Sequence, residues 1–288
     1  YYIEAYDGIN HAYFGNKTNP INIVITDRTP PIPIIDCPSR ANEDTPITFS
    51  AARSYDNIGI LNYTWIFGDG TISYGVNVTH IYSEPGIYTV TLIVTDTSGN
   101  TANASKIITI IDITPPNAII NAPIEAEVHE SILFDGSASS DNVGIISYMW
   151  NFDDGSTGYG SITMHSYSYP GIYNVALTVF DAAGNNASTI HQIRIIDSTP
   201  PTPYILAPDV ANVNMTVVFN ASASYDNVMI TDYIWDFGDG STGKGMIVTH
   251  SYSEAGIYNV TLTVIAVSYT HLRAHETEAD LVCRLLLE

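Results

Sequence analysis

The stretch WDFGDGSTG at Trp235–Gly243 occurs in related form twice earlier in the chain, as WIFGDG at Trp65–Gly70 and WNFDDG at Trp150–Gly155. The three tryptophans are spaced by 85 residues. The same spacing separates prolines, aspartates and histidines in three sets: Pro30, Pro115 and Pro200; Asp56, Asp141 and Asp226; His80, His165 and His250. A fixed period of this length indicates a tandem array in which each copy is one small domain.

Within each copy the apolar residues alternate instead of recurring every three or four positions, as in Tyr173, Val175, Leu177 and Val179. Alternation with β-branched and aromatic residues is typical of half-buried strands, and no helix is predicted in the repeats. Turn signals fall every eight to twelve residues, for example at Phe67–Gly70. This rhythm predicts an all-β chain in which each repeat has about seven short strands in two packed sheets.

The alternation also predicts the core of each sandwich. A buried tryptophan on the third strand faces a phenylalanine on the second strand and a valine on the sixth, where an antibody domain has its disulfide. A tyrosine two residues before that valine occupies the position of a tyrosine corner. The expected residues are Trp65, Trp150 and Trp235; Phe49, Phe134 and Phe219; Val90, Val175 and Val260; and Tyr88, Tyr173 and Tyr258.

The glycines Gly238, Gly240 and Gly243 match G-x-G-x-x-G, the dinucleotide-binding fingerprint. That fingerprint requires a helix after the glycines, because the helix N-terminus holds the pyrophosphate. Here another predicted strand, Met246–His250, follows instead. We therefore interpret the glycines as a tight hairpin turn with positive φ, and not as a nucleotide site.

Each copy resembles a PKD domain, an Ig-like module. The resemblance rests on W-x-F-G-D-G and on the pattern H-x-Y-x-x-x-G-x-Y-x-V-x-L-x-V that follows it. It implies tandem Ig-like β-sandwiches arranged as beads on a string, of the kind that acts as spacer or contact module in archaeal and bacterial cell-surface proteins. The expected divisions are the end of a preceding Ig-like or fibronectin-like domain (1–26), repeat 1 (27–112), repeat 2 (113–197), repeat 3 lacking its last strand (198–266) and a tail (267–288).

Composition favours an extracellular protein. The formal net charge is −21, which disfavours nucleic acids and anionic membranes as partners because both would be repelled. No apolar run is long enough to insert into a membrane. The two cysteines rule out a disulfide framework, and Cys37, which aligns with Ala122 and Ala207, is expected to be a small buried side chain. Eight Asn-x-Ser/Thr acceptor sequences fit a secreted or cell-surface location. They begin at Asn16, Asn62, Asn77, Asn103, Asn186, Asn214, Asn220 and Asn259.

The two ends differ from the repeats. Tyr1–Gly8 and Ile21–Thr26 are expected to form a final hairpin of the preceding domain. At the other end the repeat phase predicts an aspartate at position 266, but the chain has Ala266 and then a segment rich in Leu, Arg, His and Cys. This tail resembles translated sequencing-adapter read-through; the alternative is a short helix with Leu281, Leu285 and Leu286 on one face.

Two sets of candidate site residues have a structural interpretation. His80, His165 and His250 each lack a second His or Cys nearby in the sequence, so we interpret them as structural and not as metal ligands. The aspartates of the W-x-F-G-D-G turns are expected to stabilise those turns. They are Asp69, Asp154 and Asp239.

The carboxylates at one pole of each sandwich are the stronger candidates. In an Ig-like topology the incoming linker, the loop after the second strand and the loop between the last two strands meet there. This predicts that Asp27, Asp56 and Asp96 lie together in one group and Asp112, Asp141 and Asp181 in another. Clustered carboxylates suit Ca²⁺, which would also stiffen the joints between domains. Repeat 3 has Ala266 in place of the last carboxylate and should bind an ion more weakly.

No constellation for catalysis is visible. The sequence therefore predicts a non-enzymatic extracellular spacer or adhesive stalk, with calcium as the one cofactor hypothesis. One alternative is a module that binds surface proteins or glycans through exposed tyrosines: Tyr55, Tyr63, Tyr148, Tyr159, Tyr225 and Tyr233. Another is an accessory region of a secreted hydrolase.

Overall fold

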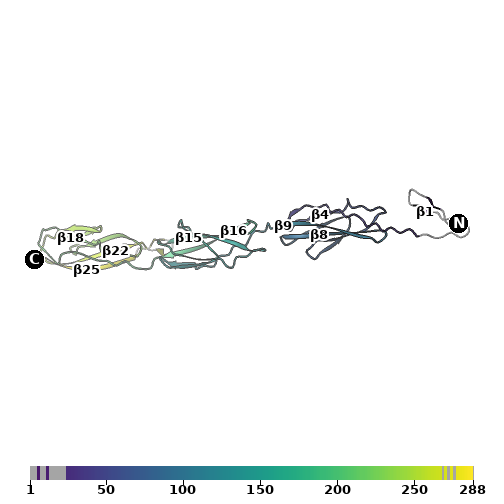
Figure 1. Ribbon diagram of the computed structural model, residues 1–288. Helices are drawn as coiled ribbons and strands as arrows, with labels where there is room; N and C mark the ends of the chain where they lie inside the picture. Colours follow the sequence, from purple (N-terminus) through teal and green to yellow (C-terminus); the bar gives the residue numbers. More distant parts are fainter. Residues whose placement is uncertain are drawn as a thin grey trace. The chain divides into compact units, whose positions relative to one another are not determined.

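The computed structural model describes residues 5–6, 11–12, 24–267, 269–270, 273–274 and 277–287. All regular secondary structure in these residues is β-strand, which confirms the all-β prediction (Figure 1). The chain divides into two compact units, Tyr1–Ile113 and Thr114–Glu288. The described residues include no helix long and apolar enough to cross a membrane.

Repeat 1 is a sandwich of one five-stranded and one two-stranded sheet. The large sheet has the order β3-β9-β8-β5-β6, with β3 parallel to β9 and the other pairs antiparallel. The small sheet pairs β4 with β7, and bridges from Ile32 to Tyr55 and from Asp36 to Ser50 lay the incoming segment beside it. The strands are β3 (Arg40–Asn42), β4 (Ile47–Ser50), β5 (Ile60–Ile66), β6 (Ile72–Tyr74), β7 (Asn77–His80), β8 (Gly86–Asp96) and β9 (Thr101–Ile111).

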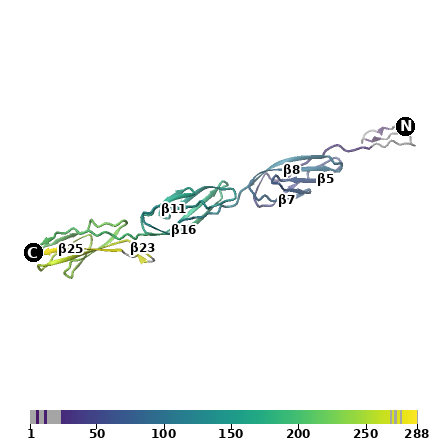
Figure 2. The same cartoon turned by 90° about the horizontal axis from the view of Figure 1, so that it is seen from below.

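Repeat 2 has the same topology, with a large sheet of order β10-β16-β15-β12-β13 and a small sheet of β11 and β14. Figure 2 shows β11 and β16 in the two layers of this sandwich. Its strands are β10 (Glu125–Glu127), β11 (Ile132–Asp135), β12 (Ile145–Asn151), β13 (Thr157–Tyr159), β14 (Ile162–His165), β15 (Gly171–Asp181) and β16 (Asn186–Ile196).

Repeat 3 repeats this order as β17-β25-β22-β19-β20, with β18 and β21 as the small sheet. Its strands are β17 (Val210–Ala211), β18 (Val217–Asn220), β19 (Ile230–Asp236), β20 (Thr242–Lys244), β21 (Ile247–His250), β22 (Ile257–Ala266) and β25 (Thr277–Leu287). Two short strands, β23 (Tyr269–Thr270) and β24 (Arg273–Ala274), pair with each other.

The tail is not the short helix considered as an alternative, and the prediction that repeat 3 lacks its last strand is wrong. The tail supplies β25, which pairs with β22 from Ala266↔Thr277 to Ile257↔Leu286 and occupies the position of β9 and β16. Apolar residues alternate along Ala279, Leu281, Cys283 and Leu285, which is the period of a strand and not of a helix.

At the other end, most of the expected hairpin of Tyr1–Gly8 with Ile21–Thr26 lies outside the described residues, within which β1 (Ala5–Tyr6) pairs with β2 (His11–Ala12).

Each sandwich has its own core, and the predicted residues form it. Trp150 is fully buried, packs 5.9 Å from Phe134 between ring centroids, and pairs in register with Leu177 of β15. Its indole N–H donates to the carbonyl of Gly160 at 2.9 Å. The equivalent tryptophans of repeats 1 and 3 are also fully buried. Burial of such large side chains supplies much of the driving force for folding each domain.

The tyrosine corner is confirmed in all three repeats. The hydroxyl of Tyr88 donates to the carbonyl of Glu84 at 2.9 Å, and Tyr173 and Tyr258 make the equivalent bond to the residue four positions upstream. Cys37 is half-buried and packs against the core of repeat 1, close to the prediction.

The W-x-F-G-D-G stretches are hairpin turns, as predicted. Gly68 and Gly70 have φ of 87° and 93°, a conformation that costs residues with a side chain about 1–2 kcal/mol. In repeat 2 the first of these positions is Asp153, which adopts φ of 66°. Its carboxylate accepts a hydrogen bond from the backbone N–H of Asn174 at 2.9 Å. This bond offsets part of the strain at Asp153.

Candidate functional site

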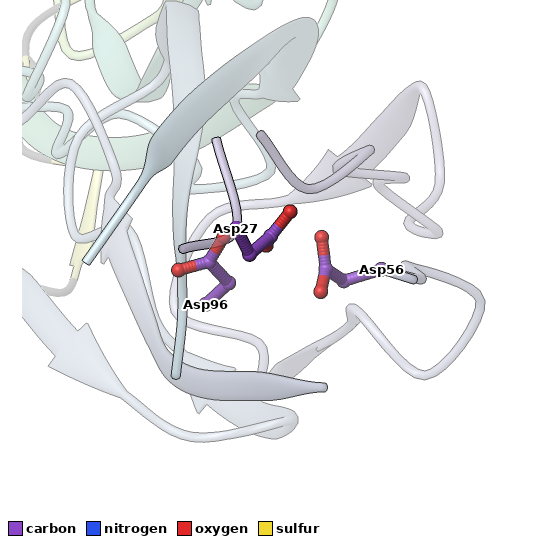
Figure 3. A group of neighbouring side chains, drawn as sticks. All are labelled: Asp27, Asp56 and Asp96. Carbon is purple, nitrogen blue, oxygen red and sulfur yellow. The ribbon is translucent and has the colours of Figure 1, made fainter. Parts of the chain in front are cut away.

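Three carboxylates meet at one pole of repeat 1. Asp27 lies in the incoming segment, Asp56 in the loop between β4 and β5, and Asp96 at the end of β8 (Figure 3). Each offers an oxygen within 4.8 Å of the other two. The sequence-based grouping is therefore correct for this repeat.

The loops hold each carboxylate in place through one of its oxygens. Asp27 Oδ1 accepts from the backbone N–H of Thr29 at 3.0 Å and from the amide of Asn57 at 3.1 Å. Asp56 Oδ2 accepts from the N–H groups of Ile58 and Gly59. These local bonds orient the side chains before any ligand is bound.

The second carboxylate oxygens of Asp27 and Asp56 are the atoms that a ligand could satisfy. Asp27 Oδ2 and Asp56 Oδ1 are buried and have no hydrogen-bond partner, and no ion pair among the described residues involves either carboxylate. A buried charged oxygen without a partner is costly. The same carboxylate atoms are unpartnered at the equivalent positions Asp141, Asp197 and Asp226.

Asp96 is the most buried member of the group, with no exposed surface. Burial by itself raises the pKa of its carboxyl, but hydrogen bonds from Asn100, Ser98 and Gly99 outweigh that effect and lower the pKa below its usual value. Asn100 donates through both its backbone N–H (2.9 Å) and its side-chain amide (2.7 Å). Asp96 is therefore held as a charged carboxylate in the interior.

This donor set fits Ca²⁺. Calcium takes six to eight oxygens at 2.3–2.6 Å, so two ligands on opposite sides of one ion are up to about 5 Å apart. Asp112, Asp141 and Asp181 also offer oxygens within 4.8 Å of one another, as predicted. Among the described residues repeat 3 forms no such group of three, because fully buried Ala266 replaces the third carboxylate. Asp197 and Asp226 are still present in repeat 3. The side-chain amide of Asn227 donates a hydrogen bond to Asp197 at 3.1 Å.

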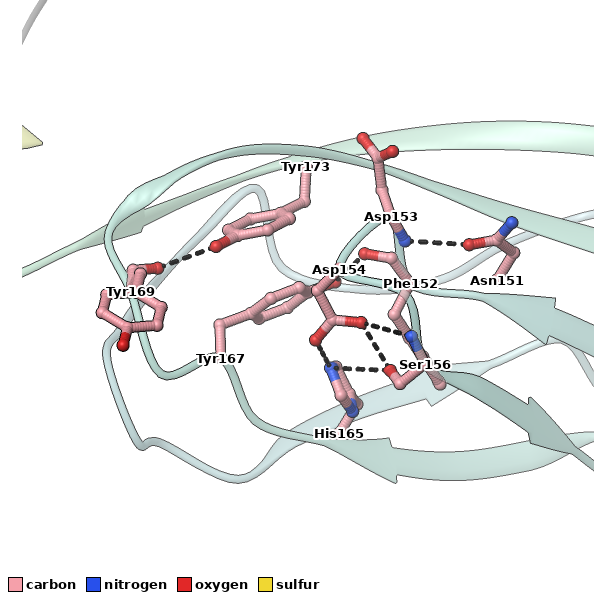
Figure 4. Close-up of polar contacts among 9 residues, drawn as sticks. All are labelled: Asn151, Phe152, Asp153, Asp154, Ser156, His165, Tyr167, Tyr169 and Tyr173. Atoms are coloured by element: carbon pink, nitrogen blue, oxygen red, sulfur yellow. Dashed lines mark hydrogen bonds and ion pairs between the residues drawn. The ribbon is translucent and has the colours of Figure 1, made fainter.

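A second polar cluster, which was not predicted from the sequence, lies at the W-x-F-G-D-G turn. In repeat 2, His165 Nε2 lies 2.7 Å from Asp154 Oδ2, and Ser156 donates its hydroxyl to Asp154 Oδ1 at 2.5 Å (Figure 4). The His165 ring stacks on Phe152 at 4.1 Å. We call this cluster of Asp, Ser or Thr, and His the turn clasp. Its members in the other repeats are Asp69, Thr71 and His80, and Asp239, Ser241 and His250.

The turn clasp has the residue types of a catalytic triad but the wrong connectivity. In a triad the serine and the acid bind opposite nitrogens of the histidine. Here Asp154 and Ser156 both lie near Nε2, the serine at 3.4 Å, and the serine hydroxyl is committed to the aspartate. The clasp therefore ties the turn to β14, as the structural interpretation of these histidines and aspartates expected. The constant spacing of 11 residues between the Asp of the turn and the His of a later strand was the available signal.

Acid should loosen the clasp of repeat 3 in a defined pH range. Hydrogen bonds from Ser241, opposed by burial and assisted by His250, lower the pKa of Asp239 to about 2. Because the folded-state pKa lies below the ordinary value of 3.8, the ionised carboxylate stabilises the fold above about pH 4. That stabilisation is lost as the pH falls from about 4 to about 2.

We expect a carboxyl NMR titration of Asp239 to show a midpoint near 2 and Ser241→Ala to move it upward. Ser253→Ala, an exposed serine outside the clasp, should leave it in place. An unchanged midpoint in Ser241→Ala would contradict the assignment of the shift to this hydroxyl.

The tyrosines proposed as an aromatic surface divide into two groups. Tyr63, Tyr148 and Tyr233 are half-buried and pack against the three cores. Tyr55, Tyr159 and Tyr225 are exposed by 57%, 70% and 67%. Tyr55 also lines a shallow cavity of about 180 Å³ together with Thr29, Pro30, Ile32, Asp56 and Asn57.

The sequence profile of the PKD domain matches residues 28–111, 113–195 and 198–277. The chain belongs to the PKD domain family. Each repeat is therefore called a PKD domain below.

Three curated relatives match parts of the chain. The chain is 41% identical to a microbial collagenase of Vibrio alginolyticus over 81 residues, which cover 28% of the chain and 10% of the collagenase. It is 29% identical to the mouse dyslexia-associated protein KIAA0319-like protein over 231 residues, or 71% of the chain and 22% of that protein. It is 27% identical to the pre-pro-metalloprotease PrtV of Vibrio cholerae over 164 residues, or 57% of the chain and 18% of PrtV.

Among solved structures, the PKD1 domain of PrtV is similar at 29% identity, covering 28% of this chain and 98% of that one, with a TM-score of 0.26. The chain thus spans less than a quarter of the length of these curated relatives.

Proposed function

We propose that this chain is a non-catalytic, extracellular spacer or adhesive stalk of a larger cell-surface protein, stiffened by Ca²⁺ at the carboxylate poles of its PKD domains. The observation that carries the proposal is the pair of buried, unpartnered aspartate oxygens in the first domain, Asp27 Oδ2 and Asp56 Oδ1, beside the buried carboxylate of Asp96. Three close carboxylates repel one another and so destabilise the pole when no cation is bound, and a divalent cation removes this repulsion.

The position of the group in the chain supports a role in stiffness. Asp27 and Asp112 each lie two residues before a Thr-Pro-Pro segment that leads into the next domain. An ion bound to such a residue ties the linker to loops of the domain that follows, and proline already restricts the linker. A bound ion would therefore reduce motion of the linker as well as stabilise the domain.

A thermal melt of the whole chain in millimolar Ca²⁺ and in chelator tests this proposal. A ligand at 100 times its Kd stabilises by about 2.7 kcal/mol, which raises the Tm of a domain of this size by on the order of 10 °C. Differential scanning calorimetry should show such a shift for the first two domains and a smaller one for the third. The absence of any shift would overturn the calcium proposal.

Asp56→Asn provides a second test, because the variant should be less stable than the wild type in Ca²⁺ but at least as stable in chelator. Asparagine keeps an oxygen for the N–H groups of Ile58 and Gly59 but removes a charge from the group. The variant should abolish the calcium shift of the first domain and melt at or above the wild type in chelator, because the repulsion is relieved. Asp44→Asn, an exposed aspartate of the same domain outside the group, is the matched control and should keep the full shift.

Two observations favour other roles. The cavity beside the exposed ring of Tyr55 favours a module that binds glycans or surface proteins, since sugar rings stack on exposed aromatic faces. The collagenase and metalloprotease relatives favour an accessory region of a secreted hydrolase. Glycan binding that survives chelation would support the first, and the sequence flanking this chain in its gene would decide the second.

A further inference from the structure

Seven of the Asn-x-Ser/Thr sequences begin at described residues. Because the fold is repeated, comparing equivalent positions shows which of these asparagines have a structural role and which do not. Each position occurs in up to three copies of one structure. An asparagine with a conformational or hydrogen-bonding role in the fold should recur as a residue able to play the same role. An asparagine without such a role can be replaced freely by the other copies.

Two of the seven have a structural explanation. Asn214 adopts φ of 66°, and the equivalent residues Asp44 and His129 adopt 53° and 64°, so this position is a turn that requires positive φ. Asn220 Oδ1 accepts from the N–H of Ser222 at 2.8 Å, as Asp135 accepts from Ser137. The acceptor sequences at Asn214 and Asn220 can therefore be by-products of turn chemistry.

The other five are exposed, and no hydrogen bond among the described residues uses their side chains. Asn259 recurs as Asn174 in the second domain, but Gly238 replaces Asp153, the residue to which Asn174 is hydrogen-bonded. Asn62 is replaced by Ser147 and Asp232 in the other domains, and Asn77 by Ile162 and Ile247. Among the described residues of the first domain, the side-chain amides of Asn62, Asn77 and Asn103 make no hydrogen bond. The five exposed asparagines are Asn62, Asn77, Asn103, Asn186 and Asn259.

Their placement directs them away from the core. Asn62 of β5 pairs with Thr95 of β8, and Asn103 of β9 pairs with Ile93 of β8. Both asparagines lie on the outer face of the large sheet, away from the buried face that carries Trp65. Because side chains alternate along a strand, each asparagine and its Ser or Thr two residues on share this outer face. Asn186 and Asn259 lie on the same outer face of their own large sheets, and Asn77 lies on the outer face of the small sheet, next to buried Val78.

We propose that these five asparagines are acceptors for N-linked glycans, which cover chiefly the outer face of the large sheets. In the reaction the side-chain Nδ2 forms a bond to C1 of an oligosaccharide carried on a lipid diphosphate. The bond between C1 and the diphosphate oxygen breaks, and the lipid diphosphate leaves with the proton from the amide. The proposal rests on the extracellular location in the proposed function and is independent of calcium.

The fold accommodates these glycans once they are attached. Strand residues are held rigidly, so attachment precedes or accompanies folding, and the finished sandwich must then leave room for the sugar. Exposed positions opposite the core side chains do so without displacing any packed residue. Such a coat would also keep other chains from stacking on the large sheets. Protein contacts would then be directed to the poles and to the small sheets of the second and third domains, since Asn77 lies on the small sheet of the first.

Glycopeptide mapping of the chain, secreted from cells with an N-glycosylation pathway, tests the proposal. Release of glycans by peptide N-glycosidase in heavy-oxygen water marks every occupied asparagine. We expect all five to be marked, while a co-secreted glycoprotein confirms that the pathway is active. Unmodified asparagine at all five positions in that sample would overturn the proposal, whatever the response to calcium.

Matched substitutions identify each site on the intact protein. Thr64→Val and Thr79→Val keep the asparagine and the β-branched strand residue but remove the hydroxyl of the acceptor sequence. Each should remove one glycan from the mass of the secreted chain. Thr95→Val, beside Asn62 on the neighbouring strand but outside any acceptor sequence, should remove none. Loss of no glycan in Thr64→Val and Thr79→Val would contradict the assignment of these two sites.

Discussion

Trp150→Ala is expected to lower the free energy of unfolding of the second PKD domain by about 3–5 kcal/mol. The substitution removes a fully buried ring that lies 5.9 Å from Phe134 and 6.4 Å from Phe152, between centroids. It also leaves the carbonyl of Gly160 without the indole N–H. Because a domain of this size is stable by only about 5–15 kcal/mol, this is a large fraction of its stability.

Calorimetry of the whole chain measures this effect, since each domain has its own core cluster and the first domain should keep its transition. Met149→Ala is the matched control. Met149 neighbours Trp150 on β12 but is 40% exposed on the opposite face, so its loss should cost well under 1 kcal/mol. A cost of about 1 kcal/mol for Trp150→Ala would mean that the core collapses around the gap.

The core of each domain is predictable from sequence because the repeats supply their own comparison. The alternation Tyr173, Val175, Leu177 fixes which face of β15 is inward, and the same pattern in two other copies excludes coincidence. The carboxylate group is predictable for a different reason. An Ig-like topology brings three particular loops to one pole, so Asp27, Asp56 and Asp96 are placed by connectivity alone.

Features set by short elements or by side-chain rotamers were not predictable. β3 has only three residues, Arg40–Asn42, so it shows no usable period, and its parallel pairing with β9 gives the five-to-two division of the sheets. The turn clasp depends on the rotamer with which His165 of β14 reaches Asp154 in the turn, and the constant spacing of 11 residues does not by itself reveal that contact. The role of Asn100 in holding Asp96 depends on the same kind of local geometry.

Gly68→Ala is expected to destabilise the first PKD domain by about 3 kcal/mol, for two separable reasons. Gly68 has φ of 87°, which costs a residue with a side chain about 1–2 kcal/mol. A Cβ there would also lie 2.8 Å from the backbone oxygen of Thr89, so β8 must shift to accept it. Calorimetry of the whole chain, with the other two domains as internal references, measures the loss.

Gly70→Ala separates the two contributions, because Gly70 has φ of 93° but a Cβ added there would meet no other atom within 4 Å. It should cost only the conformational part, about 1–2 kcal/mol. Equal losses of unfolding free energy in Gly68→Ala and Gly70→Ala would show that β8 shifts away from the added Cβ without an energetic cost. Gly68→Asp is expected to be milder than Gly68→Ala, because Asp153 occupies this position in the second domain and its carboxylate accepts from the N–H of Asn174. Thr89 is the equivalent of Asn174, so its N–H is expected to make the same bond. A larger side chain is therefore expected to destabilise the turn less than a smaller one.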